Sequence, residues 1–402
     1  MEPSSPAVRA APLREVALLF LRLGCTAFGG PAAHIAMMHE EVVRRRGWVS
    51  DERFVDLLGV ANLIPGPTST ELAIYLGFVR AGWAGLALAG ACFIAPAMMI
   101  VLALAWGYRT FGALPQARWL FAGVQPVVVA IVAHALWNLR RVALKTLWSL
   151  PLLAVIVAAY LLGVNVLAVL LIGAALTGGV GALARWRSGP HTASGGVSLG
   201  WLALNHHTPI WRLALARAPL ALLAAVAPFT YVTLFLTFLK IGAIVYGSGY
   251  VLLAYLRADL VQGLHWLTTR QLLDAVAVGQ FTPGPVFTTA TFIGYLVGGW
   301  PGALVATLAI FLPSFALIAA IRPVAGRLRS SPWTAPVLDG VNVASLALMV
   351  GVLAQLAQVA LADAISWLVA LGALALLLRT RVNPAWLILA GAAIGLARYG
   401  LF

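Results

Sequence analysis

Two short segments, Pro65-Gly66-Pro67 and Pro283-Gly284-Pro285, interrupt long apolar stretches at matching places in the chain. Proline and glycine disfavour a continuous helix, and non-helical backbone is tolerated within a bilayer only where protein buries it or a polar cavity hydrates it. Paired interruptions of this kind are typical of transporters whose substrate site lies between two related halves. The two breaks therefore predict a substrate site near mid-membrane depth.

The composition indicates an integral membrane protein. Hydrophobic residues make up 62% of the 402 residues and charged residues only 9%, which is outside the range of soluble domains. Apolar runs of about 20 residues, such as 86–108 and 303–321, match the length of a bilayer-spanning helix. We therefore expect an all-α polytopic membrane protein, and the first 13 residues show no pattern of a removable signal.

Charge and cysteine content argue against several other classes of protein. The net charge is +14, but the Lys and Arg residues occur mostly singly between hydrophobic runs. Membrane orientation and attraction to anions explain this pattern better than nucleic-acid binding does. Cys25 and Cys92 are the only cysteines and both have apolar neighbours, so we expect no disulfide, no metal site and no cofactor.

An internal duplication accounts for most of the chain. Residues that match at a separation of 218 positions, apart from the two breaks, include Gly24 with Gly242, Trp48 with Trp266 and Asp56 with Asp274. After the loss of one residue, Gly82-Trp83 matches Gly299-Trp300, and Gly123 matches Gly340. The chain is therefore divided into an N-terminal repeat (1–184), a polar linker (185–217) that we expect to be cytoplasmic, and a C-terminal repeat (218–402).

Basic residues predict that the two repeats have opposite orientations in the membrane. Arg140, Arg141 and Lys145 lie in a loop whose counterpart carries no basic residue, whereas Arg379 and Arg381 flank the counterpart of a neutral loop. A bias that changes sides is the pattern of an inverted repeat. We expect about ten spanning helices plus two re-entrant elements at the breaks, with an additional crossing within 218–239 as the alternative.

The breaks have the chemistry of an anion site. Proline at a first helical position favours helices that begin at Pro67 and Pro285, whose unpaired backbone N–H groups attract anions. Gly66 and Gly284 precede these prolines, and Asn62 and Gln280 lie three residues before each break. The hydroxyl side chains near the breaks are those of Thr68, Ser69, Thr70, Thr282, Thr288 and Thr289. These hydroxyls either bind an oxyanion or bond back to their own helices.

Charged residues within the apolar elements are the remaining candidates. Arg22 and Lys240 occupy matching positions, and two cations suit a dianion, although either could also pair with a carboxylate or extend to an interface. Glu71 follows the first break by one turn, where it either complements the helix dipole or serves as a proton-coupling group. His34 is a second candidate, and His134 lies mid-span; a lone histidine in such a place is more often a helix contact.

These motifs together resemble the chromate ion transporter family. The resemblance rests on Phe28-Gly29-Gly30-Pro31 with the nearby His34, on the segment 62–67, and on the segment 280–285, and it covers nearly the whole chain. It implies a two-half member of the inner (plasma) membrane that expels chromate and confers resistance, with Gly29 and Gly30 at the substrate site. It also implies sulfate as a related or competing oxyanion. In the second half, Tyr246-Gly247-Ser248-Gly249 departs from the pattern, so the halves are expected to contribute unequally.

Other functions receive less support from the sequence. The apolar elements contain no His-Glu-x-x-His, no Gly-x-Ser-x-Gly and no phosphate-binding loop, so we expect neither an intramembrane enzyme nor an ATP-driven pump. A passive anion channel or exchanger would use similar helix ends, and the sequence does not separate it from a carrier. The expected partners are an oxyanion and the lipid bilayer, with a homodimer as a possibility and no nucleic acid.

Overall fold

The computed structural model describes residues 6–28, 30–112, 114–145, 149–187, 229–246, 249–321, 334–380 and 382–400. These residues are almost entirely helical and form no β-strand. Most of the predicted linker, the predicted site residue Gly29 and the basic residues Arg322, Arg327 and Arg329 lie outside the described residues.

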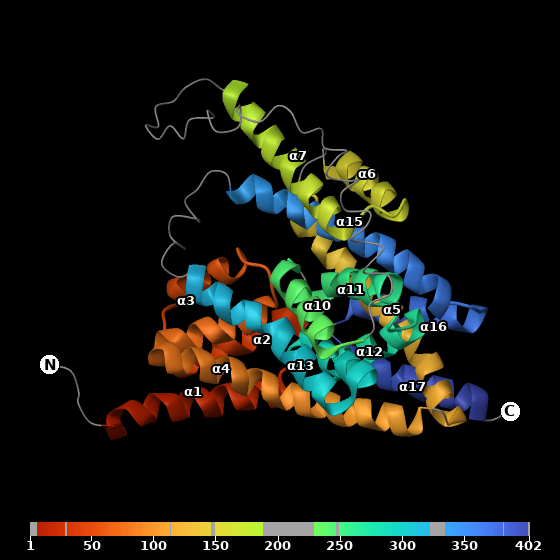
Figure 1. The fold of residues 1–402 in the computed structure, drawn as a ribbon, viewed down its shortest axis with the longest axis horizontal. Coiled ribbons are helices and arrows are strands. Elements are labelled where there is room, and N and C mark those ends of the chain that lie inside the picture. Colours follow the sequence, from red (N-terminus) through yellow and green to blue (C-terminus); the bar gives the residue numbers. More distant parts are fainter. Residues whose placement is uncertain are drawn as a thin grey trace.

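The two halves contain equivalent helices in the same order along the chain (Figure 1). The first half comprises α1 (Pro6–Thr26), α2 (Gly30–His39), a π-helical turn (Glu40–Arg45), α3 (Asp51–Ala61), α4 (Thr68–Phe111), α5 (Pro115–Ala143), α6 (Ser149–Leu161) and α7 (Val166–Arg187). The second comprises α10 (Tyr231–Ile244), a 3-10 turn (Gly249–Val251), α11 (Leu252–Leu256), a π-helical turn (Arg257–Gly263), α12 (Thr269–Phe281), a 3-10 turn (Val286–Thr288), α13 (Thr289–Ile321), α15 (Thr334–Ala360), α16 (Ala364–Arg379) and α17 (Pro384–Gly400).

Several of these helices are long and apolar enough to cross a membrane. Among the described residues there are 4 such segments, Thr68–Phe111, Pro115–Arg141, Val286–Ile321 and Val337–Ala360, and further apolar helices of 10–17 residues accompany them. The chain is therefore a multi-pass, all-helical membrane protein. The total of ten spans stays a prediction.

Local conformation repeats along with the sequence. Ser50 caps the N-terminus of α3 by accepting a hydrogen bond from the Arg53 N–H, and the equivalent Thr268 caps α12 through Gln271. Gly82 and Gly299 have the same left-handed φ of 64° and interrupt α4 and α13 at equivalent points. Each break is therefore followed by a short helix that ends at a glycine kink.

The two halves are interleaved instead of lying side by side as separate bundles. α5 packs against α16 and α17 of the second half, and its counterpart α15 packs against α6 and α7 of the first. α4 and α13, which follow the two breaks, pack against each other as well (Figure 1). The interface between the halves therefore runs through the centre of the fold and brings both breaks close to it.

Glycines permit the closest helix contacts between the halves. Gly123 of α5 lies against Gly391 and Gly395 of α17, and the equivalent Gly340 of α15 lies against Gly173 of α7. Small residues let helix backbones approach closely in membranes, where packing and not hydrophobic burial drives association.

We expect Gly123→Ala to destabilise the protein, because the added methyl group would overlap the Gly391 carbonyl. Overpacking of this kind costs about 1–3 kcal/mol. The thermal transition of the purified protein in detergent measures the effect. Gly107→Ala in α4 is the matched control, since a methyl group there meets no atom within 4 Å, and equal stability of the two variants would contradict the interpretation.

Candidate functional site

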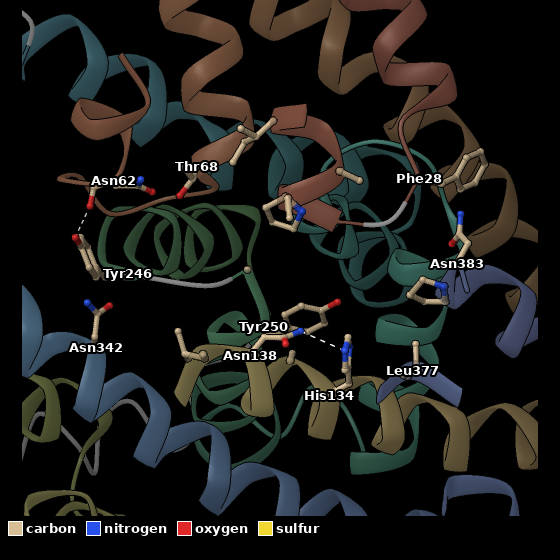
Figure 2. A pocket seen from close by; sticks show the side chains of 18 of the residues that line it. Phe28, Asn62, Thr68, His134, Asn138, Tyr246, Tyr250, Asn342, Leu377 and Asn383 are labelled. Carbon is tan, nitrogen blue, oxygen red and sulfur yellow. Dashed lines mark hydrogen bonds between the residues drawn. The ribbon is translucent and has the colours of Figure 1, made fainter. Parts of the chain in front are cut away.

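A cavity of about 1090 Å³ opens between the halves beside the first break. α5, α15 and the α16–α17 junction form one side, and the segments around the first break and around Tyr246 form the other (Figure 2). Its polar lining comprises Asn62, Thr68, His134, Asn138, Lys145, Tyr246, Tyr250, Asp339, Asn342, Thr380 and Asn383. Amide, hydroxyl and imidazole groups thus predominate over charged groups, so the cavity offers many neutral hydrogen-bond donors.

The first break forms part of the cavity wall. α3 ends at Ala61 with Asn62 as its C-cap residue, and α4 begins at Thr68. The sequence predicted that the helix begins at Pro67, but this proline has an extended ψ of 94° and is the N-cap residue instead. Pro285 has the same position before the 3-10 turn of the second half. Of the residues predicted to bind substrate, Asn62 and Thr68 line this cavity.

Each break is hydrogen-bonded to the opposite half. The Gly66 N–H donates to the Val245 carbonyl at 2.7 Å, and the Gly284 N–H donates to the Ala27 carbonyl at 2.9 Å. Gly66 and Gly284 are equivalent positions, and so are Ala27 and Val245. Reciprocal contacts between equivalent residues are what a two-fold relation between the halves produces.

Most hydroxyl groups near the breaks have partners within the protein. In the second half, Thr282, Thr288 and Thr289 donate to backbone carbonyls three or four residues earlier, which is the bonding-back alternative considered from sequence. In the first half, Ser69 is bonded to His34, while the buried Thr70 hydroxyl has no hydrogen-bond partner among the described residues. The two halves therefore differ in the donors that remain available.

Glu71 is buried next to the first break. Its side chain is 0% exposed, and Oε1 accepts a hydrogen bond of 3.4 Å from Ser314 of α13. Oε2 has no hydrogen-bond partner among the described residues, and Gly66 packs directly against the carboxyl group. Glu71 corresponds to Thr289 in the second half, and Ser314 corresponds to Ala97 in the first, so the second half has no equivalent of this buried carboxyl group.

His34 is also buried, and its contacts define its tautomer. Nε2 lies 3.0 Å from the Ala27 carbonyl, which can only accept, so this nitrogen carries a proton and donates. Nδ1 lies 3.3 Å from Ser69 Oγ and can accept from that hydroxyl. The Ala27 carbonyl is the one that accepts from Gly284, so His34 supports the contact between the second break and the first half. Gly30, which begins α2, approaches the Tyr250 hydroxyl of the cavity wall.

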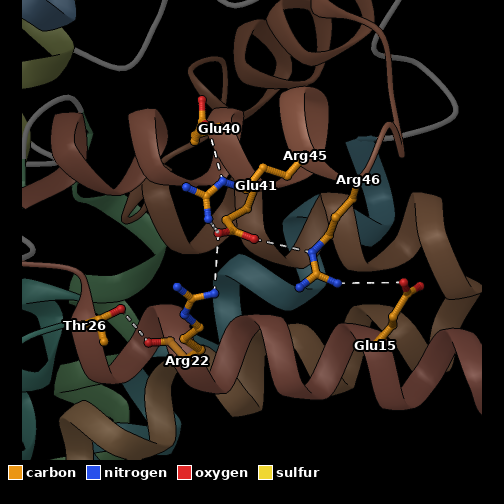
Figure 3. A network of polar contacts seen from close by, with 7 residues as sticks. All are labelled: Glu15, Arg22, Thr26, Glu40, Glu41, Arg45 and Arg46. Carbon is orange, nitrogen blue, oxygen red and sulfur yellow. Dashed lines mark hydrogen bonds and ion pairs between the residues drawn. The ribbon is translucent and has the colours of Figure 1, made fainter.

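Arg22 and Lys240 do not line the cavity. Arg22 is 62% exposed and forms an ion pair of 3.6 Å with Glu41, within a network that includes Arg45, Arg46 and Glu15 (Figure 3). Lys240 is 43% exposed and pairs with Asp259 at 2.7 Å. Glu41 and Asp259 are themselves equivalent positions. The structure thus supports the alternative that each cation pairs with a carboxylate, and the duplication of this pair accounts for their matching positions.

Within the described part of the chain, Lys145 is the one lysine that lines the cavity, and no arginine does so. It follows the C-terminus of α5, and its Nζ lies 2.6 Å from Asp339 Oδ1 of α15. In the sequence, Lys145 contributed only to the comparison of basic charge between equivalent loops and was not predicted to bind substrate. Its counterpart, Ala362, is uncharged, and this asymmetry was the available signal.

Comparison with known proteins identifies the family. The chromate transporter family matches residues 14–179 and 232–396, which cover both halves. The chain belongs to the chromate transporter family. A chromate transport protein of Cupriavidus metallidurans is 35% identical over 393 residues, which cover 97% of this chain and 94% of that protein. A probable chromate transport protein of Synechococcus elongatus is 34% identical over 90% of this chain and 89% of that protein. No solved structure matches the chain.

In this member of the chromate transporter family, one further residue that was predicted to bind substrate contacts the cavity wall from behind. Gln280 of α12 accepts a hydrogen bond of 3.3 Å from the Tyr250 hydroxyl, and its buried Nε2 has no partner among the described residues. An amide donor left unpaired in a buried place costs free energy unless a ligand or water completes it. Gln280 and Thr70 are therefore two of the predicted binding residues whose buried polar atoms remain without a hydrogen-bond partner within the described residues.

Proposed function

We propose that this protein is a secondary transporter of tetrahedral oxyanions that expels chromate across the plasma membrane. The membership of the family and the names of the relatives support chromate as the substrate. The observation that carries the site is the polar cavity at the first break, where neutral donors and one lysine converge between the halves. Sulfate, which shares the charge and shape of chromate, is the expected competitor.

The proposed binding mode uses many donors and little fixed charge. Asn62, Asn138, Asn342 and Asn383 can donate amide N–H groups to the oxygens of the anion, and Thr68 can donate its hydroxyl. Lys145 supplies the charge-assisted hydrogen bond, which is about twice as strong as a neutral one. A site with few cations also releases a dianion readily, as a transporter must.

Electrostatics favours efflux over uptake. Moving one charge across 100 mV is worth about 2.3 kcal/mol, so a dianion that leaves a negative interior gains roughly 4.6 kcal/mol. At about 1.4 kcal/mol per tenfold change, this favours export more than a thousandfold. Efflux therefore requires no coupled ion, whereas uptake would require about two or more accompanying cations.

Alternating access is proposed to use the duplicated architecture. The reciprocal hydrogen bonds of Gly66 and Gly284 support a two-fold relation between the halves, and the change in basic charge between equivalent loops supports inverted orientations. About ten spans with two re-entrant breaks fit this arrangement. Glu71 is the proposed proton-coupled group, because burying an ionised carboxylate without a counter-charge costs several kcal/mol.

Flux of labelled chromate and sulfate across the membrane of proteoliposomes, in both directions and with membrane potential and pH gradient set independently, tests this function. A carrier is expected to show saturable chromate flux that sulfate inhibits and that an inside-negative potential drives outward. Absence of flux for both anions would overturn the proposal. Flux that rises linearly with concentration would indicate a channel.

Lys145 and Asp339 give opposite predictions for substrate affinity. We expect Lys145→Gln to raise the KM for chromate about tenfold, equivalent to about 1.4 kcal/mol, because it removes the cation from the cavity. Asp339→Asn is expected to lower KM severalfold, because Lys145 loses its competing partner. Arg141→Gln is the control, since Arg141 lies in the last turn of α5 and does not line the cavity. Effects of the same sign in both variants would contradict the binding role.

A further inference from the structure

A second cavity, of about 420 Å³, lies at the other end of α5. Arg118, in the first turn of α5, and Arg270, in the first turn of α12, contribute to its lining. From Arg118 to Ala143 α5 extends about 38 Å at 1.5 Å per residue, which exceeds the roughly 30 Å of a bilayer core. Because α5 is long and apolar enough to span the membrane, the two cavities face opposite sides of it.

Equivalent residues of the two halves line the two cavities. Phe121, Ala122 and Gln125 of α5 line the second cavity, and their counterparts in α15, Leu338, Asp339 and Asn342, line the first. An entrance on one side of the protein thus corresponds to an entrance on the other. This correspondence is expected for the two ends of a single path through a pair of related halves.

A short apolar layer separates the cavities. On α5, Gln125 lines one cavity and His134 the other, about 14 Å apart along the helix. The buried residues between them are Pro126, Val127, Val128, Val129, Ala130, Ile131 and Val132. On α12, Asp274 lines the second cavity and Gln280 is bonded to Tyr250 of the first, about 9 Å away along that helix.

The side chains of the second cavity favour an anion at its mouth. Arg118 and Arg270 are exposed, and neither takes part in an ion pair or a side-chain hydrogen bond within the described ranges. Asp274, 3% exposed at the floor, accepts hydrogen bonds of 2.9 Å from Gln125 and from Tyr108. These internal donors stabilise the charge of the Asp274 carboxylate, and Arg270 interacts with it electrostatically at longer range. The lining of this cavity thus carries two guanidinium groups and one carboxylate.

We propose that this second cavity binds the transported oxyanion at the opposite membrane face, with Arg118 and Arg270 as its cationic contacts. A guanidinium group is planar and can donate two parallel N–H groups to two oxygens of a tetrahedral oxyanion, which makes the contact bidentate. The Asp274 carboxylate at the floor repels a dianion and so confines it to the mouth, beside the two guanidinium groups. This inference rests on the proposed oxyanion transport and assigns its second access site.

Kinetics measured from each side separately test the arginines. In proteoliposomes of defined orientation, the R118Q/R270Q double variant is expected to raise the KM for chromate about tenfold when chromate is supplied on the α5 N-terminal side. The KM measured from the Lys145 side is expected to stay within twofold. Arg109→Gln is the control, because Arg109 is exposed near the end of α4 on the same side but does not line the cavity.

A binding readout separates the site from transport. In a Cys25→Ala/Cys92→Ala background, Ala122→Cys and Asn138→Cys are labelled with a membrane-impermeant thiol reagent, and sulfate or molybdate serves as the probe because chromate oxidises thiols. We expect labelling from opposite sides, and protection of Ala122→Cys by the probe that the R118Q/R270Q substitutions abolish. Protection without any flux would refute the transport function and leave this anion site standing. Unchanged protection and unchanged KM in the double variant would overturn the site itself.

Discussion

Replacement of Gly66 by alanine is expected to abolish chromate flux, with a loss of at least about a hundredfold. Gly66 has a φ of 138°, which side chains other than glycine rarely adopt, and such strain costs about 1–3 kcal/mol. An added methyl group would also overlap the Glu71 carboxyl group and lie 2.8 Å from the Ser314 hydroxyl. Both effects would displace the Gly66 backbone and weaken its hydrogen bond to the Val245 carbonyl of the other half.

A matched control separates backbone strain from steric overlap. Gly82 also has a positive φ, of 64°, but a methyl group there meets nothing within 4 Å. Gly82→Ala should therefore lose only about 1–3 kcal/mol of stability, which is the cost of backbone strain alone, and retain much of its flux. The measurement is initial flux per molecule of correctly inserted protein, together with the thermal transition in detergent.

A double-mutant cycle identifies the atoms responsible. If the overlap with the carboxyl group matters, Glu71→Ala should recover part of the stability that Gly66→Ala loses, with a coupling of about 0.5–3 kcal/mol. Additive losses would show that the two residues act independently and would contradict the packing described for the first break.

Part of the fold was predictable because helix breakers at equal spacing leave few options for the backbone. The apolar lengths and the Pro-Gly-Pro segments predicted an all-helical chain with a helix that begins at Pro67. The structure is all-helical, and it places the first residue of that helix at Thr68, one position later. The interleaving of α5 with α16 and α17 was not predictable, because the repeat specifies which segments are equivalent but not which half each one contacts. The cavity depends on that packing, so Lys145, Asn138 and Asn383 escaped sequence reasoning.

The position of the charged residues shows a related difficulty. Matching positions for Arg22 and Lys240 suggested a shared role at a substrate site, yet the duplicated feature is a cation with its own carboxylate, Glu41 or Asp259. Sequence fixes neither the direction of a side chain around the helix nor its partner. Glu71 differs, because its position one turn beyond Pro67 places it against Gly66 by local geometry alone, and the structure finds it there.

Replacement of Glu71 by glutamine is expected to remove any dependence of flux on a pH gradient. Glutamine has nearly the same shape and can still accept the hydrogen bond from Ser314, but it can neither bind nor release a proton. Because the carboxyl group is fully buried with one oxygen unpaired, a proton or another cation must accompany it whenever the site excludes water. Flux driven by a pH gradient should therefore fall at least about tenfold.

Flux driven by membrane potential alone distinguishes coupling from structural damage. If Glu71 carries the coupled proton, Glu71→Gln should retain potential-driven chromate efflux, since a dianion needs no coupled ion to leave a negative interior. Glu52→Gln, at an exposed position in the first turn of α3, should behave as wild type under both driving forces. An equal loss of flux under both would indicate that Glu71 stabilises the break and carries no proton. Unchanged pH dependence would place the coupling group elsewhere, and His34, hydrogen-bonded to Ser69 two residues before Glu71, is then the next buried group to test.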